Sequence, residues 1–513
     1  MLTHGGSVST WSRAEDALRE KFIEARYQVL NIPGRIAGQT CEGPTRRELL
    51  RIGSLGLAGL HLPGFFLSQQ AAKAAGTANK YAGARGFENA KNVIMIFLQG
   101  GPSHIDIWDP KPDAPENIRG IFKPIKTKIP GTWIGEHMPM MAQTMDKVTL
   151  IRSMSYTPNG LFNHTAAIYQ MLTGYPPDKV SPSGQLEPPN AQDFPTAGSH
   201  VSKLKPMKDA MLPFVELPRP LQESGIIGKG GAAGFLGKAY DPYRMYQDPA
   251  GKVTLEDLSL RKDIPPERLK ERFELLKGIN ASMPDLEKAL NKSAVDEYYG
   301  KAYDLVLSGK ARDAMDLTKE TPQMRERYGL HTFGQSVLMA RRLIEAGTKF
   351  VQVNWPSVAN GDPEKTAWDT HAANFAPLKN LHCPKLDRSL SALLEDMDQR
   401  GLLKETLVVA IGEFGRSPRM GVSTSGNSNS PDGRDHWPYC YSGVVAGAGI
   451  ARGMQYGESD ATASSPKEKP VHPNDLLATI YYALGIDPDM EIRNHLNQPR
   501  ELVKGKVLAD LFM

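Results

Sequence analysis

The chain has 513 residues, of which 40% are hydrophobic and 23% are charged. This composition is that of an ordinary globular protein, and the length fits one large α/β domain with insertions or two domains. The net charge of only +4, with no basic stripe along the sequence, argues against a nucleic-acid partner.

The first part of the chain has the features of an export signal. Arg46 and Arg47 precede an apolar, glycine-rich stretch at residues 52–67, and the small residues Ala72 and Ala74 follow at the spacing of a cleavage site. This pattern resembles a twin-arginine signal. The apolar stretch is shorter than the roughly 20 residues that cross a membrane. A retained membrane anchor and an ordinary core helix are the alternatives.

The signal defines the expected organisation of the chain. Residues 1–74 form the signal region, residues 75–90 a linker and residues 91–513 the folded domain. We therefore expect a periplasmic or secreted protein that is exported by the twin-arginine machinery and has no stable membrane span after cleavage. Cleavage leaves Cys383 and Cys440, which either pair in an oxidising compartment or stay as two buried thiols.

The first strand of the folded domain ends in a group of polar residues. Residues 93–98 are an unbroken apolar run of strand length, and a Gly-Gly-Pro turn at residues 100–102 ends it. His104 and Asp106 follow directly. Ionisable side chains just beyond the carboxyl end of a buried strand are typical of sites in open α/β sheets.

A second strand and a helix follow along the chain. Residues 147–151 predict a short strand, and residues 165–172 have a helical pattern that stops at Gly174. The next segment, at about residues 177–346, is rich in Pro, Ser and Gly and then becomes helical, so we interpret it as an insertion between the halves of a sheet. Its glycine-rich run at residues 228–237 lacks the spacing of a phosphate-binding loop and predicts a flexible loop.

The strand pattern resumes after the insertion. Residues 350–353 and 406–411 have the pattern of buried strands, and a long amphipathic helix at residues 380–400 lies between them. Short apolar strands that alternate with helices predict an α/β fold, with a mostly parallel central sheet flanked by helices.

Acidic and imidazole residues recur just beyond these strands. They are the ingredients of a site for one or two divalent metal ions, zinc or calcium, which hold an anionic substrate and activate a nucleophile. Taken alone, a pair such as Asp369 and His371 is more simply interpreted as a hydrogen-bonded loop pair, but the shared position at strand ends favours the metal. The expected ligands are His104, Asp106, Asp369, His371, Glu413, Asp435, His436 and His472.

Seven stretches, spread over nearly the whole expected mature chain, carry a resemblance to a known family. They are LQGGPSHIDIWDPKP, NHTAAIYQMLTGYPP, ARRLIEAG, WDTH, VVAIGEFGRSPR, GRDHWP and HPNDLLATIYYALGI. In this order they resemble an exported bacterial family, the domain of unknown function numbered 1501, within the alkaline phosphatase and sulfatase superfamily. The resemblance implies an alkaline phosphatase-like sheet, a bimetal site at the strand ends and hydrolysis of phosphate or sulfate esters.

The sequence departs from the superfamily pattern at the nucleophile. Residues 172–176 are similar to the Leu-Thr-Gly-x-Tyr-Pro motif that follows the nucleophile, and counting back places His164 at the nucleophile position with Thr165 beside it. Gln99 stands where the superfamily has a metal-binding Asp, and Glu413 stands where Asp-His is usual. Neither remaining cysteine begins the Cys-x-Pro-x-Arg signal that the formylglycine route of sulfatases requires.

Two functional hypotheses follow. The first is an exported, metal-dependent hydrolase in which Thr165 or a metal-held water attacks a phosphate or sulfate ester. Arg416 would neutralise charge on the transferred group because its planar fork suits a tetrahedral oxyanion, and a structural salt bridge is the alternative role. The second hypothesis is a non-catalytic binding protein on the same fold that holds a sulfated or phosphorylated glycan.

Overall fold

The structure is a computed structural model, and all the residues that it describes lie in one unit of the chain, Ala78–Met513. The described residues are 79–177, 188–207, 209–223, 226–251, 253, 258, 265–281, 305–306, 308–356 and 367–513. The predicted signal region at residues 1–74 and most of the linker lie outside them. Within these ranges no helix has both the length and the apolar character needed to span a membrane.

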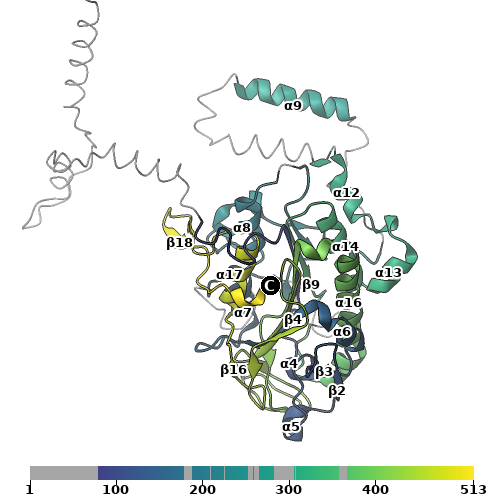
Figure 1. Cartoon of the computed structure of the whole chain (residues 1–513). Coiled ribbons are helices and arrows are strands. Elements are labelled where there is room, and N and C mark those ends of the chain that lie inside the picture. The colour runs from purple at the N-terminus through teal and green to yellow at the C-terminus, as the bar shows by residue number, and fades with distance from the viewer. Residues whose placement is uncertain are drawn as a thin grey trace, which may run out of the picture. The chain divides into compact units, whose positions relative to one another are not determined.

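An eight-stranded sheet forms the centre of the fold (Figure 1). The third strand from one edge, β13, makes two antiparallel pairs, with β10 and β4, and the other five pairs of neighbours are parallel. The predicted α/β fold with a mostly parallel sheet is confirmed. In spatial order the strands are β14 (Met454–Tyr456), β4 (Val148–Met154), β13 (Tyr441–Ala446), β10 (Thr406–Ile411), β1 (Asn92–Phe97), β9 (Phe350–Asn354), β5 (Phe214–Leu217) and β8 (Tyr243–Arg244).

The apolar run of β1 forms a central strand because both of its faces are buried. Ile94 and Ile96 belong to one hydrophobic cluster, and Val93, Met95 and Phe97 belong to another. Successive side chains of a strand point to opposite faces of a sheet, so the two clusters are the two layers of the core. A strand that is covered on both sides favours apolar residues at every position, which explains the unbroken apolar sequence.

Helices cover both faces of the sheet (Figure 1). The layer that contains Ile94 is built from α6 (Pro139–Thr144), α14 (Thr332–Glu345) and α16 (Cys383–Gln399). The opposite layer is built from α7 (His164–Thr173), α8 (Ala197–Leu204) and α17 (Pro473–Ala483).

Further elements complete the part of the chain that the structure describes. The remaining described helices are α4 (His104–Ile107), α5 (Glu116–Arg119), α9 (Pro266–Ala281), α12 (Lys310–Met315), α13 (Pro322–Tyr328) and α15 (Phe375–Pro377). The two-stranded sheets pair β2 (Pro124–Lys126) with β3 (Trp133–Gly135), β6 (Gln222–Glu223) with β7 (Ile226–Ile227), β11 (Gly415–Arg416) with β12 (His436–Trp437), β15 (Glu458–Ser459) with β16 (Pro466–Glu468), and β17 (Glu491–Arg493) with β18 (Pro499–Glu501).

The segment at residues 177–346, which the sequence presents as an insertion, contributes directly to the central sheet. Its strands β5 and β8 continue the sheet beyond β9, and its helix α14 packs in the core. Sequence patterning does not indicate β5 because this strand is only four residues long and lies in a proline-rich stretch. The expected flexible loop at residues 228–237 contains a short 3₁₀ helix, Gly234–Leu236.

The strand directions bring several loops to one edge of the sheet. Phe97 at the end of β1 pairs with both Ile411 of β10 and Asn354 of β9, so these three strands end at the same level. Because β13 runs antiparallel to β10, the residues that precede it start at that same edge. Strand β4 runs antiparallel to β13, so the segment between β4 and α7 also begins there.

The two cysteines of the folded domain do not form a disulfide. Cys383 and Cys440 are both buried free thiols. Burial raises the pKa of each thiol, because a low-dielectric environment disfavours the thiolate. The sequence leaves open a disulfide or two buried thiols, and the structure has the two buried thiols.

A buried histidine makes the stability of the fold depend on pH. His200 of α8 is 1% exposed, and its Nδ1 lies 2.8 Å from the hydroxyl of Tyr481 in α17. Burial, with a smaller effect of Lys203, lowers the pKa of His200 to about 3, against about 6.5 in an unfolded chain. The unfolded state binds more protons between these values. This stabilisation is therefore complete above pH ~6.5 and is lost as the pH falls through that window.

The substitution His200→Asn tests this linkage. Asn keeps a hydrogen-bonding group for Tyr481 but does not titrate. Lowering the pH from about 7.5 to about 5.5 should reduce the free energy of unfolding of the wild type by about 1 kcal/mol more than that of the variant. Chemical denaturation at both pH values measures the difference. Equal losses in the two proteins would contradict the assignment.

Candidate metal centre

Four side chains converge at the carboxyl edge of the sheet. The Nε2 atoms of His371 and His436 lie 2.9 Å apart, and Asp369 Oδ1 lies 2.9 Å from the first and 3.5 Å from the second. Asp369 Oδ2 lies 3.5 Å from His164 Nε2. We call these four residues the histidine cluster. Two groups of three residues among those described could hold a metal ion, because the donor atoms within each group lie within 4.8 Å of one another. The first group is His164, Asp369 and His436, and the second is His371, Asp435 and His436.

The members of the histidine cluster come from separate segments at this edge. His164 is the first residue of α7, and the side chain of Asn163 caps that helix by accepting a backbone hydrogen bond at 3.1 Å. His436 belongs to β12, which pairs with β11 just beyond the end of β10. Asp369 and His371 lie in the loop that leads from β9 to α15.

Each imidazole of the cluster is held through its other ring nitrogen. His164 Nδ1 lies 2.5 Å from Glu413 Oε1, and His436 Nδ1 lies 2.5 Å from the carbonyl oxygen of Phe162. His371 Nδ1 lies 2.9 Å from Asn429 Oδ1. An oxygen acceptor at Nδ1 favours a proton on that nitrogen, so the lone pair of the neutral imidazole is on Nε2. The Nε2 atoms of His371 and His436 thus lie side by side next to Asp369 Oδ1, and His164 Nε2 faces the other carboxylate oxygen. Nitrogen atoms oriented in this way are typical of histidine-rich metal sites.

Glu413 holds His164 of the histidine cluster in place. It is fully buried, and its Oε1 accepts a hydrogen bond from Gly100 N at 2.8 Å in addition to its contact with His164. Its Oε2 has no hydrogen-bond partner among the described residues. Gly100 has φ 108°, and a Cβ at this position would lie 2.5 Å from Trp368 N. Only glycine lets the turn after β1 approach the Asp369 loop this closely.

Asp435 is fully occupied by hydrogen bonds from its own neighbourhood. It accepts from the backbone N–H groups of Thr424, Ser425 and His436 and from the hydroxyl of Ser425. Burial alone would raise the pKa of Asp435, but the hydrogen bonds from Ser425 and Thr424 outweigh it and lower the pKa to about 2. Its Oδ1 also lies 3.2 Å from His371 Nδ1, so Asp435 orients that imidazole.

Arg416 lies inside the protein rather than at the surface of the site. It is 0% exposed, and its guanidinium donates to the carbonyl oxygens of Gly100, Gly101 and Arg434. One Nη atom lies 2.5 Å from Asp369 Oδ1. The arginine therefore joins the turn after β1, the segment before β12 and the Asp369 loop, and it fixes the carboxylate of the cluster.

The charges within the cluster are strongly coupled. Burial would raise the pKa of Asp369, but the positive charges of Arg416 and His164 outweigh it and hold that pKa well below its usual range. Burial would lower the pKa of His164, but Asp369 and Glu413 outweigh it and raise the pKa to about 9. Burial, together with the charge of His164, lowers the pKa of His436 to about 3.

The cluster is open to solvent on the Asp369 side. The side chain of Asp369 is 32% exposed, whereas those of His164 and His371 are 13% exposed and that of His436 is 5% exposed. The ring of Phe414, which is buried, packs against His164 and His436 with centroid distances of 4.8 Å. The cluster thus has an apolar wall behind it and one accessible carboxylate.

Two other histidines that the sequence suggests as ligands lie elsewhere. His104 is 1% exposed, and its Nε2 lies 2.9 Å from the carbonyl oxygen of Ala463. His472 caps α17, where its Nδ1 accepts from Asn474 N at 3.2 Å. Neither belongs to the groups of metal-ligating atoms found among the described residues.

Asp106 lies in a buried ion pair. Its carboxylate accepts hydrogen bonds from Ser103, Asn374 and the guanidinium of Arg434, and both charged side chains are 0% exposed. The pair joins α4 to the segment before β12. All these donors belong to the protein, so the arrangement indicates a structural role for Asp106.

Thr165, which the sequence suggests as a nucleophile, and Gln99, which follows β1, are also buried. Thr165 is 1% exposed, and its Oγ1 has no hydrogen-bond partner among the described residues. Gln99 is 6% exposed, and its amide donates to the carbonyl oxygen of Gln222 at 3.0 Å. Gln99 therefore links β1 to β6 and supplies no side chain to the histidine cluster.

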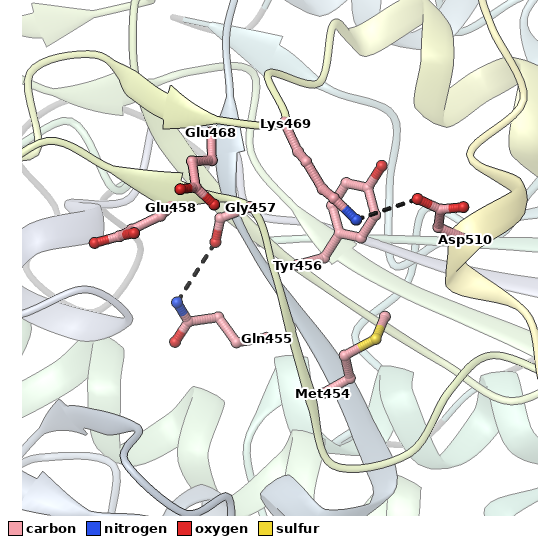
Figure 2. Close-up of a pocket in the computed structure, with 8 residues that line it drawn as sticks. All are labelled: Met454, Gln455, Tyr456, Gly457, Glu458, Glu468, Lys469 and Asp510. Carbon is pink, nitrogen blue, oxygen red and sulfur yellow. Dashed lines mark hydrogen bonds and ion pairs between the residues drawn. The ribbon is translucent and has the colours of Figure 1, made fainter.

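A separate pocket lies at the edge strand β14. Figure 2 shows its eight lining residues, Met454, Gln455, Tyr456, Gly457, Glu458, Glu468, Lys469 and Asp510. Its volume is about 250 Å³. Lys469 is paired with Asp510 at 3.1 Å, so its charge is already satisfied. None of the residues that the sequence suggests for the site lines this pocket.

Sequence analysis misses two parts of the centre. The sequence places His164 at the nucleophile position, and in the structure its imidazole lies in one of the groups that could hold a metal ion. It also has no signal for Asn429 or for the Phe162 carbonyl, because a serine- and asparagine-rich loop and a backbone oxygen have no distinctive residue pattern. The closeness of Phe162 to His164 in the sequence is the one feature that indicates a position near the site.

The fold and the cluster define an α/β protein with a candidate metal centre at the carboxyl edge of its central sheet. The chain belongs to the family described as "Protein of unknown function (DUF1501)", whose model matches residues 90–512. No curated protein matches the chain in sequence.

Solved structures with a similar fold include three enzymes. PsFucS1 sulfatase from Pseudoalteromonas sp. is 13% identical, with a TM-score of 0.33 over 82% of this chain and 72% of that one. Phosphonate monoester hydrolase SpPMH from Silicibacter pomeroyi is 11% identical, with a TM-score of 0.35 over 82% and 76%. A mutant of TAB5 alkaline phosphatase with Mg bound is 12% identical, with a TM-score of 0.32 over 78% and 99%. Similarity at this level carries no information about the reaction of this chain.

The structural role of Asp106 predicts a large loss of stability in Asp106→Asn. The substitution leaves the buried guanidinium of Arg434 without its counter-charge, which should cost about 3–5 kcal/mol. The matched control is Glu458→Gln, which removes an exposed partner of Lys467 and should cost at most about 1 kcal/mol. Chemical denaturation measures both values, and similar losses in the two variants would argue against a structural ion pair.

Proposed function

We propose that this chain is an exported, metal-dependent hydrolase of phosphate or sulfate esters. The observation that supports it most is the arrangement of His164, His371 and His436, each held at Nδ1 by an oxygen and directed by Nε2 toward Asp369. A cluster of imidazoles with a carboxylate, open to solvent on one side, is the donor set of a catalytic metal site. The motif at Arg46 and Arg47 supports export by the twin-arginine route.

The residues present fit a metal ion. His164 Nε2 and Glu413 Oε2 are buried atoms without a hydrogen-bond partner among the described residues, and such atoms indicate a missing ligand or ion. Three nitrogens and one carboxylate suit zinc, whereas calcium takes oxygen ligands almost entirely. The two candidate ligand groups share His436, which favours a single ion. We assign His164, Asp369, His371 and His436 as its ligands.

The roles of the chain's own residues follow from their contacts. An ion at this position would polarise the ester and favour hydroxide over water at neutral pH. Glu413 holds His164, and Arg416 holds Asp369, so the ligand atoms stay in place without a substrate. Because the Thr165 hydroxyl is 1% exposed, we assign the attack to a water molecule rather than to this residue.

The second candidate function is a binding protein for sulfated or phosphorylated glycans. The burial of Thr165 and the engagement of Gln99 in a backbone hydrogen bond favour it, because neither then offers a reactive group. The open side of the cluster at Asp369 serves either function equally.

Metal content and turnover together test the proposal. Protein purified from the export compartment should contain about one zinc per chain and release nitrophenol from its phosphate monoester, diester or sulfate. Asp369→Asn removes the accessible ligand charge and should lower turnover by about 100-fold or more. Elemental analysis and absorbance measure the two quantities. Metal without turnover would favour the binding protein, and the absence of metal would exclude the centre.

The role of Glu413 predicts a weaker but specific effect. Glu413→Gln removes the carboxylate that holds His164 and should weaken zinc affinity about 10–100-fold. The control is His472→Asn, since Asn is also a good helix cap and His472 lies outside the histidine cluster. Competition with a chromophoric chelator measures both affinities. An unchanged affinity in Glu413→Gln, or an equal loss in the control, would refute this role.

A further inference from the structure

Three aromatic rings lie together beside the histidine cluster. The rings of Phe162 and Tyr439 have centroids 5.5 Å apart with an interplanar angle of 73°, and those of Trp437 and Tyr439 have centroids 5.3 Å apart with an angle of 75°. All three residues are partly exposed. Large aromatic side chains that are left partly exposed as a group are common at binding surfaces. We call these residues the aromatic corner.

The aromatic corner directly adjoins His436 of the histidine cluster. The carbonyl oxygen of Phe162 lies 2.5 Å from His436 Nδ1, and Trp437 follows His436 in β12. Gly160 lies so close to Tyr439 that a Cβ there would approach its ring to 2.8 Å. The loop before α7 is therefore packed on this ring, and the corner and the cluster are positioned by the same two segments.

Polar groups border the rings. The indole N–H of Trp437 donates to the carbonyl oxygen of Ser464 at 2.8 Å, which fixes the orientation of this partly exposed ring. The hydroxyls of Thr462 and Ser464 lie 2.7 Å apart in the same loop. A site for a polar ligand typically combines aromatic faces with a few fixed hydrogen-bonding groups.

We propose that the aromatic corner binds the sugar ring of a saccharide ester whose phosphate or sulfate lies at the histidine cluster. This inference rests on the proposed function and names its substrate class. The neighbouring rings meet nearly at right angles, so they form a corner rather than the parallel-walled slot that would sandwich a flat aryl group. A sugar ring presents C–H bonds on its faces and hydroxyls at its edge, which suits this corner and the hydroxyl-bearing loop beside it.

The experiment compares esters that differ only in the ring. Calorimetry measures the affinity of the wild type for glucose 6-sulfate and glucose 6-phosphate, each against the ethyl ester of the same acid. We expect at least one glucose ester to bind about tenfold more tightly than its ethyl counterpart. Trp437→Ala should remove this preference. Tyr439→Ala is the second variant and should act in the same direction.

Trp133→Ala is the matched control, because Trp133 is 40% exposed on β3 and lies outside the aromatic corner. It should leave the preference intact. Equal affinity for both esters, no binding of either, or a preference that survives in both corner variants would overturn the proposal. The proposal would also be overturned if phenyl phosphate bound more tightly than glucose 6-phosphate and Trp437→Ala removed that difference. That result would assign the aromatic corner to aryl esters.

The outcomes separate this inference from the proposed function. A ring preference that depends on Trp437, found without turnover of any ester, would support the saccharide subsite and reject the hydrolase. Turnover of nitrophenyl esters without a ring preference would support the hydrolase and reject the subsite.

Discussion

The buried guanidinium of Arg416 is the interaction on which the candidate centre depends. It donates to carbonyl oxygens of the turn after β1 and of the segment before β12, and it contacts the carboxylate of Asp369. A buried cation is stable only when its hydrogen bonds and counter-charge are complete, and removing one partner of such a pair typically costs about 3–5 kcal/mol. The three segments that Arg416 joins are therefore held in one arrangement, and the ligand atoms have little freedom to separate.

The strands and their common edge could be predicted from the sequence. The apolar runs of β1 and β10 reflect strands whose two faces are covered, and the parallel pairing of β1 with β9 and β10 brings the carboxyl ends of the three strands together. The placement of Asp369 and His371 at this edge follows from that rule, whereas His436 reaches it because it precedes the antiparallel strand β13. The short strand β5 could not be predicted, because four residues in a proline-rich stretch carry no clear periodicity.

The separate roles of the acidic residues could not be predicted. Asp106, Glu413 and Asp435 all follow or precede a strand at the same edge, but their hydrogen-bond partners differ. Asp106 is paired with Arg434, which lies more than three hundred residues away in the sequence. Asp435 accepts hydrogen bonds from a local loop, and one oxygen of Glu413 has no hydrogen-bond partner in the part of the chain that the structure describes. Such differences arise from tertiary contacts, and a residue type at a given spacing does not encode them.

The antiparallel direction of β13 has a consequence for how the centre forms. Because this strand runs antiparallel to β10, the segment that precedes it reaches the site. That segment contains His436 and lies late in the chain, whereas His164 lies in an early part. Contacts between such distant segments form slowly, since the intervening chain must first be ordered. A nascent chain that ends before residue 436 lacks part of the candidate centre, so only a nearly complete domain holds all four residues of the histidine cluster. Occupancy of the centre would therefore report that the whole domain has folded.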